Sequence, residues 1–412
     1  MTRFQVFSVL VIAIFLGLAL DASAVSVKET VLYNFNCGAT LSCEPMGALA
    51  RDAAGNLYGT TNDGGDSTCG NGGGCGTVFE LSLNGTGGWT ETVLHAFGGG
   101  SDGAFPRAGL VLDAKGNLYG TTFQGGGSNA CNLGCGTIFE LTLTAGMWTE
   151  SILYAFTGQA DGANPAAGLV FDRNGNLYGT AFGGGASTTC GGGGCGVVFQ
   201  FRQVAGRWEE TVLYNFTNPG PANPVNGVVL DYLGDLYGNG QGGVYGGGAV
   251  FRLIPSTNGW TEQTIWSFGI GAYGCSPNGV IVYKNALFGT AGCGAYGVGT
   301  VFELTPAIGN WNMQVIHAFT GGNDGGEPLA GLTAGQNYLY GTTAFGGYYQ
   351  QGTVFALAPS GNNGEWTETV VYNFTGVSDG LNPYNPLLLT PGSLTGYANG
   401  RTDQLVFQIA PN

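Results

Sequence analysis

The chain has 412 residues, of which 80 are glycine and only 9% are charged, and its formal net charge is −15. An acidic protein argues against nucleic acid as a partner, because phosphates need Lys and Arg, and equally against an anionic membrane surface. The glycines lie among regularly spaced aromatic and β-branched residues, so we interpret them as loop and turn residues rather than as low-complexity sequence.

The first 24 residues predict a secretory signal peptide. Arg3 supplies the positive charge, residues 4–20 form an apolar run, and Ala22-Ser23-Ala24 provides small residues for cleavage. The alternative is an uncleaved membrane anchor, for which the apolar run is short. We therefore expect a secreted protein, extracellular or periplasmic, with no membrane insertion after cleavage and with residues 25–412 forming one domain.

A repeated unit occupies the rest of the chain. A Leu-Tyr-Gly phrase or a close variant begins at Leu57, Leu118, Leu177, Leu236, Leu287, Leu339 and Leu394. Each copy is followed by a glycine-rich loop and a variant of Gly-Thr-Val-Phe-Glu-Leu. In six copies a variant of Trp-Thr-Glu-Thr-Val-Leu-Tyr-Asn-Phe comes next, and the tryptophans that open it lie 51 to 60 residues apart. Such a period is typical of propeller blades.

The second repeat shows how many strands each unit contains. Its strand-like runs are residues 109–113, 117–122, 137–143 and 148–156, separated by turn residues, and no segment shows a helical period. Four strands in each of seven units predict an all-β, seven-bladed β-propeller. The expected blades are residues 45–97, 106–156, 165–216, 224–268, 277–319, 328–374, and 383–411 together with 28–35.

The last unit lacks a Trp-led fourth strand, and the missing phrase lies at the other end of the mature chain. Residues 28–35 read Lys-Glu-Thr-Val-Leu-Tyr-Asn-Phe, which matches the fourth strand of the other units. We expect this N-terminal strand to complete the C-terminal blade, because closing the ring removes the open sheet edges of a linear array.

These phrases resemble those of the GloVer tandem-repeat family of exported bacterial proteins. The resemblance rests on Gly-Asn-Leu-Tyr-Gly-Thr-Thr, Gly-Thr-Val-Phe-Glu-Leu and Thr-Val-Leu-Tyr-Asn-Phe, and it covers nearly all of the mature chain. It implies an exported repeat protein with a propeller-like fold, and it implies no particular activity.

The ten cysteines of an exported chain predict five disulfides. The expected pairs are Cys37 with Cys43, Cys69 with Cys75, Cys131 with Cys135, Cys190 with Cys195, and Cys275 with Cys293. In a four-stranded blade the loops between the second and third strands and the crossovers to the next blade emerge on one face, and all ten cysteines fall in them. Metal ligation by thiolates is the alternative, but the spacings match no zinc template well.

Few residues suggest catalysis. His95 and His317 are the only histidines, and both occupy a slot that holds tyrosine in other repeats, so we expect them to be packing or surface residues. An Asp-Gly-x-x-Pro phrase recurs in four crossovers, and turn formation explains it; a weak Ca²⁺ site is the functional alternative. Its carboxylates are Asp102, Asp161, Asp324 and Asp379.

Function is expected where the repeats differ, and the glycine-rich loops differ most. The candidate ligand-binding residues in or beside them are Tyr245, Tyr296, Tyr348, Tyr349 and Tyr397. Aromatic rings beside neutral amides suit a glycan or a cell-surface protein. We therefore expect a monomeric, non-catalytic binding module without a cofactor other than Ca²⁺. The alternatives are a carbohydrate-active hydrolase or lyase with carboxylates near the central channel, and a structural envelope protein.

Overall fold

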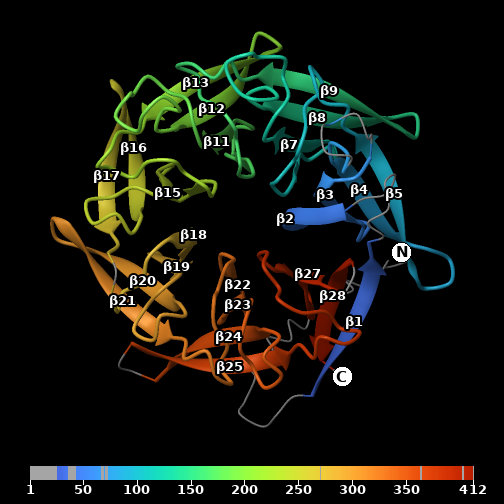
Figure 1. Cartoon of the computed structure of the whole chain (residues 1–412), viewed down its shortest axis with the longest axis vertical. Helices are drawn as coiled ribbons and strands as arrows, with labels where there is room; N and C mark the ends of the chain where they lie inside the picture. The colour runs from blue at the N-terminus through green and yellow to red at the C-terminus, as the bar shows by residue number, and fades with distance from the viewer. Residues whose placement is uncertain are drawn as a thin grey trace, which may run out of the picture.

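Each repeat phrase forms a β-strand, and the strands assemble into seven antiparallel sheets of four, arranged in a ring (Figure 1). The computed structural model describes residues 26–35, 43–65, 69, 73–269, 271–361, 364–400 and 403–411, and every regular element in them is a strand. The predicted seven-bladed propeller is confirmed. The predicted signal peptide and Cys37 lie outside the described residues.

Each blade runs from an inner strand beside the channel to an outer strand. Blade 1 contains β2 (Cys43–Arg51), β3 (Leu57–Asp63), β4 (Thr77–Leu83) and β5 (Trp89–Ala96); blade 2 contains β6 (Val111–Leu112), β7 (Leu118–Thr122), β8 (Thr137–Thr144) and β9 (Met147–Ala155). Blade 3 contains β10 (Val170–Phe171), β11 (Leu177–Ala181), β12 (Val197–Val204) and β13 (Arg207–Asn215); blade 4 contains β14 (Val229–Leu230), β15 (Leu236–Gly240), β16 (Ala249–Ser256) and β17 (Gly259–Ser267). Blade 5 contains β18 (Pro277–Tyr283), β19 (Ala286–Ala291), β20 (Thr300–Ala307) and β21 (Asn310–Ala318); blade 6 contains β22 (Thr333–Ala334), β23 (Leu339–Thr343), β24 (Thr353–Ser360) and β25 (Glu365–Asn373). Blade 7 contains β26 (Leu388–Thr390), β27 (Ser393–Asn399), β28 (Gln404–Pro411) and β1 (Val27–Asn34).

The glycine that ends the Leu-Tyr-Gly phrase makes room for a buried phenylalanine. In blade 2, a Cβ added to Gly120 would lie 2.5 Å from Cζ of Phe139 on the next strand. Phe139 is fully buried, and burying such a ring contributes about 1.5–3 kcal/mol. The recurring pair of glycine and phenylalanine is therefore a packing requirement of each blade.

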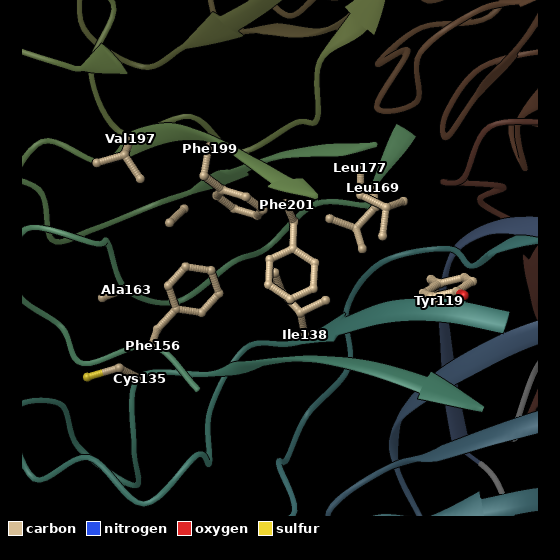
Figure 2. Packing of buried hydrophobic residues seen from close by; sticks show 11 residues of the cluster. Tyr119, Cys135, Ile138, Phe156, Ala163, Leu169, Leu177, Val197, Phe199 and Phe201 are labelled. Atoms are coloured by element: carbon tan, nitrogen blue, oxygen red, sulfur yellow. The ribbon is translucent and has the colours of Figure 1, made fainter. Parts of the chain in front are cut away.

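The hydrophobic core lies between blades as well as within them. Figure 2 shows one interface, where Ile138 and Phe156 of blade 2 pack with Leu177, Phe199 and Phe201 of blade 3. The second and third strands supply most of these side chains because both of their faces are covered by neighbouring blades. Each blade thus buries its apolar surface only when its neighbours are present.

Side chains near the channel also join neighbouring blades. Thr60 Oγ1 donates to the carbonyl of Ala108 at 2.8 Å, and Thr121 Oγ1 donates to the carbonyl of Ala167 at 3.1 Å. The same position supplies the equivalent donor in the next three blades, through Thr180, Asn239 and Thr290. These bonds hold the start of the inner strands of blades 2 to 6 against the preceding blade.

The N-terminal strand closes the ring as predicted. β1 is the outer strand of blade 7 and pairs antiparallel with β28, with Val27 opposite Pro411 and Asn34 opposite Leu405. Figure 1 shows β1 beside β28 in the same blade. Closure removes the exposed edge that β28 would otherwise present.

Candidate functional site

Four disulfides identify the face of the propeller that carries the long loops. They join Cys69 to Cys75, Cys131 to Cys135, Cys190 to Cys195, and Cys275 to Cys293, with Cα atoms 5.1 to 5.3 Å apart. These four predicted pairs are confirmed. Because consecutive strands of a blade are antiparallel, the loops between second and third strands and the crossovers between blades share this face, which we call the loop face.

Backbone hydrogen bonds join the disulfide-bridged loops, which we call the stapled loops, to the crossovers beside them. The carbonyl of Cys75 accepts the amide of Phe105 at 2.7 Å, and the carbonyl of Cys135 accepts the amide of Asn164 at 2.7 Å. Phe105 has a φ of 56° and Asn164 also has a φ of 56°. Such a backbone is strained for a non-glycine residue, so the surrounding contacts must hold it. These contacts hold Phe105 and Asn164 of the crossovers against the stapled loops.

A repeated turn presents tyrosines on the loop face of blades 4, 5 and 6. It reads Gly-Val-Tyr-Gly at 243–246, Gly-Ala-Tyr-Gly at 294–297 and Gly-Tyr-Tyr-Gln at 347–350. In each turn the amide of the fourth residue donates to the carbonyl of the first at 3.0 Å. The fourth residues, Gly246, Gly297 and Gln350, have φ values of 72°, 78° and 58°.

The side chains of these turns point into solvent. Tyr245 is 72% exposed, Tyr296 is 64% exposed, Tyr348 is 71% exposed and Tyr349 is 51% exposed. The rings of Tyr348 and Tyr349 meet edge to face with centroids 4.9 Å apart, and the amide of Tyr348 donates to Oδ1 of Asn373 at 2.8 Å. We call these four residues the tyrosine arc. It places amphipathic rings on three consecutive blades without a charged residue in the turns.

Tyr397 is not part of this surface. It lies within β27 rather than in a loop, is only 1% exposed, and packs with Phe35 and Phe79 between blades 7 and 1. It occupies the strand position that holds Thr60 in blade 1, and a large ring fills the space at the closure of the ring. The prediction that Tyr397 contacts a ligand is therefore wrong, because no ligand on the loop face can reach it.

The four predicted Ca²⁺ ligands lie apart, each in a different crossover. The carboxylate of Asp161 accepts hydrogen bonds from the Tyr154 hydroxyl at 3.0 Å and from the Thr157 amide at 2.7 Å. Asp379 accepts the same pair of bonds, from Tyr372 and Thr375. Beside Asp102 and Asp324 the position of this tyrosine is held by a histidine, His95 and His317 respectively. The hydrogen bonds that these aspartates accept explain the Asp-Gly-x-x-Pro phrase as a turn. The Ca²⁺ site stays a prediction.

A glutamate of the adjoining outer strand lies close to each of these carboxylates, and the sequence reasoning missed it. Burial, followed by the charge of the nearby aspartate, raises the pKa of Glu210 to about 7 beside Asp161. The same two causes raise the pKa of Glu29 and of Glu368 to about 7. One oxygen of each of these three side chains is buried without a hydrogen-bond partner. The recurrence of Glu in the Trp-Thr-Glu phrase was the available signal.

A groove separates the stapled loops of blades 1 and 2 on the loop face. It has a volume of about 570 Å³ and is lined by Cys69, residues 98–100, Phe105 and residues 127–134. The lining is uncharged. Backbone groups of glycines, with Asn129 and Asn132, supply its polar atoms, and apolar side chains such as Phe105 and Leu133 make up about half of it. The groove is therefore suited to a neutral, hydrogen-bonding group.

The central channel has a different character. Its described lining residues come from the inner strands of the blades and from the segments just before them. They are mainly Gly, Ala, Val and Leu, and the polar ones are Arg107, Asn226, Asn278, Tyr384 and Asn385. Among those lining residues there is no Asp or Glu. The carboxylate pair that the hydrolase or lyase alternative needs near the channel has no counterpart there.

Comparisons with solved structures identify the fold and nothing more. The mitotic checkpoint complex contains a chain with a TM-score of 0.51, 10% identity and coverage of 100% of both chains. A crystal structure from Thermus thermophilus, described as a proposed oxidoreductase (glucose dehydrogenase), has a TM-score of 0.44 and 13% identity, and covers 93% of this chain and 100% of that one. At such identities a shared fold does not indicate a shared activity.

Sequence comparisons are more specific. No curated protein matches the chain.

The described residues contain no helix of the length and hydropathy that a membrane span requires. The four disulfides are consistent with an exported protein. A family model described as the Gloeobacter/Verrucomicrobia repeat matches residues 20–191 and 130–313, together more than half of the chain, and the chain therefore belongs to this repeat family.

Proposed function

We propose that this protein is an exported, non-catalytic binding module that recognises a neutral glycan through the tyrosine arc. The observation that carries the proposal is the recurrence of one exposed tyrosine turn on blades 4, 5 and 6. Exposed rings held by hydrogen-bonded turns lose little conformational freedom on binding, which favours affinity.

The chemistry of the arc favours a sugar over a charged ligand. A tyrosine ring offers an apolar face for the C–H groups of a sugar and a hydroxyl for its polar groups. The three turns contain Gly, Val, Ala, Tyr and Gln and no Asp, Glu, Lys or Arg. A charged ligand would find no residue of opposite charge in the turns. A neutral polyol can pack its C–H groups on the ring faces and hydrogen-bond to the tyrosine hydroxyls.

The test is a binding screen of neutral polysaccharides and oligosaccharides with the oxidised protein, run with Ca²⁺ and with EDTA. We expect saturable binding, and we expect the double variant Tyr348→Ala/Tyr349→Ala to weaken it by at least about 30-fold, the loss of about 2 kcal/mol typical of a central contact. Dependence on Ca²⁺ would support the predicted ligands in the crossovers.

Tyr232→Ala is the matched control. Tyr232 is 72% exposed, as Tyr245 is, but it lies in the turn between β14 and β15 on the opposite face. Its loss should leave binding unchanged. Equal weakening by Tyr232→Ala, or unchanged affinity of the double variant, would contradict the assignment to the arc. Absence of glycan binding would contradict the proposal and favour a cell-surface protein partner or a structural role.

A further inference from the structure

We propose that His95, Asp102 and Glu150 form a binding site for a divalent transition-metal cation, with Zn²⁺ as the best fit, at the outer rim between blades 1 and 2. Each residue offers one ligand atom, and the three atoms all lie within 4.8 Å of one another. Nε2 of His95 is 3.1 Å from Oδ1 of Asp102. All three side chains are partly exposed, so an ion and its water ligands can reach them.

Three different elements position the ligands. His95 lies on β5, where its ring packs edge to face on Phe97 with centroids 4.8 Å apart. Asp102 lies in the crossover to blade 2, and its Oδ2 accepts the amide of Gly98 at 2.6 Å. Glu150 lies on β9. The imidazole ring and the aspartate are therefore oriented before any ion arrives.

Glu150 supplies the unsatisfied group. Its Oε1 is buried and has no hydrogen-bond partner, and a buried carboxylate oxygen without a donor destabilises the folded protein. A cation bound at this oxygen would satisfy it. Oε1 is also without a partner in Glu210 and Glu368, at other blade junctions. The unpartnered oxygen alone therefore does not single out the junction of blades 1 and 2.

The histidine distinguishes this junction from those at which a tyrosine holds the same position. At the next junction the slot holds Tyr154, whose hydroxyl donates to Asp161 instead of offering a nitrogen lone pair. His317 shares the slot at the junction of blades 5 and 6, where its Nε2 is 3.4 Å from Asp324. Among the described residues, the group at His95 is the one set of three that meets the geometry of a metal site.

The ligand set selects the class of ion. One imidazole nitrogen with two carboxylate oxygens suits Zn²⁺ and its neighbours, whereas Ca²⁺ prefers oxygen ligands alone. Zn²⁺ binds these atoms at about 2.0–2.2 Å, so ligand atoms up to 4.8 Å apart would have to move slightly inward. The partial exposure of the side chains permits that rotation.

A bound ion would join β5, β9 and the crossover that begins at Gly98. Residues 98–100 of that crossover also line the groove between the stapled loops of blades 1 and 2. A Cβ at Gly99 would lie 2.9 Å from Sγ of Cys69, which shows how closely the crossover packs against the disulfide. The ion would thus hold one wall of the groove in place.

Zn²⁺ titration by calorimetry, with the thermal midpoint measured in parallel, tests the site. The probe is zinc chloride in a non-chelating buffer, and the wild-type protein should bind one ion saturably and gain thermal stability. His95→Tyr installs the residue that other repeats carry in this slot, so the fold should be kept. We expect this variant to bind Zn²⁺ at least tenfold more weakly and to lose the thermal shift.

His317→Tyr is the matched control and should bind as the wild type does. Glu150→Gln gives an independent test that keeps the histidine, and it should also weaken binding at least tenfold. Absence of a saturable one-to-one isotherm in the wild type would overturn the proposal. So would equal affinities of the wild type, His95→Tyr and Glu150→Gln, because binding would then reflect scattered surface carboxylates.

Discussion

The buried glutamates of the outer strands make stability depend on pH, and Glu210→Gln tests this directly. Burial and the nearby Asp161 raise the pKa of Glu210 from its ordinary 4.5 to about 7. The folded protein therefore binds a proton that the unfolded chain has released. The resulting stabilisation is fully present below about pH 4.5 and is lost as the pH rises through about 7.

The size of the effect follows from the change in pKa. At about 1.4 kcal/mol for each pH unit, a rise from 4.5 to about 7 corresponds to at most about 3.5 kcal/mol. Solvent screens this partly exposed side chain, so we expect about 1 kcal/mol. Glutamine resembles the protonated acid and does not titrate. Glu210→Gln should therefore match the wild type near pH 4.5 and exceed its free energy of unfolding by about 1 kcal/mol at pH 8.

Urea denaturation of both proteins at pH 4.5 and at pH 8 measures the difference. Glu209→Gln is the control, because Glu209 is an exposed neighbour on the same strand. It should change stability little at either pH. Equal stabilities of Glu210→Gln and wild type at pH 8 would refute the reasoning. A difference of the same size at both pH values would refute it too, because it would then arise from the amide and not from the charge.

Three further perturbations test the architecture. Removing residues 26–35 leaves β28 as an open edge, so we expect a lower melting temperature and concentration-dependent association on gel filtration; an unchanged melt would contradict the closure of the ring. Thr121→Val removes a buried hydrogen bond to blade 3 and should lower the free energy of unfolding by about 1–2 kcal/mol in urea denaturation. Cys190→Ser/Cys195→Ser removes a short disulfide loop and should cost about 2 kcal/mol in the same assay, and an unchanged free energy of unfolding would contradict this role of the disulfide.

The candidate site was predictable in part. Three of the disulfides join cysteines only four to six residues apart within one loop, so sequence proximity predicts them, whereas Cys275 and Cys293 are 18 residues apart and were paired because both were expected on one face of the same blade. The error at Tyr397 has a physical cause, because the sequence Leu-Thr-Gly-Tyr-Ala places this tyrosine at the strand position of Thr60, where a large ring fills the junction of the first and last blades. No one-dimensional pattern reports how much space that junction leaves.

The amino-acid sequence by itself determined the blade number, the strand order and the closure by the N-terminal strand, because strand period, turn residues and repeats are local properties. The turn at Asp113, whose carboxylate accepts the amides of Lys115 and Asn117, is an example. Only the tertiary structure decided that Asp102 meets Glu150. Asp102 lies in the crossover that leaves blade 1 and Glu150 lies on the outer strand of blade 2, and their proximity depends on how neighbouring sheets pack.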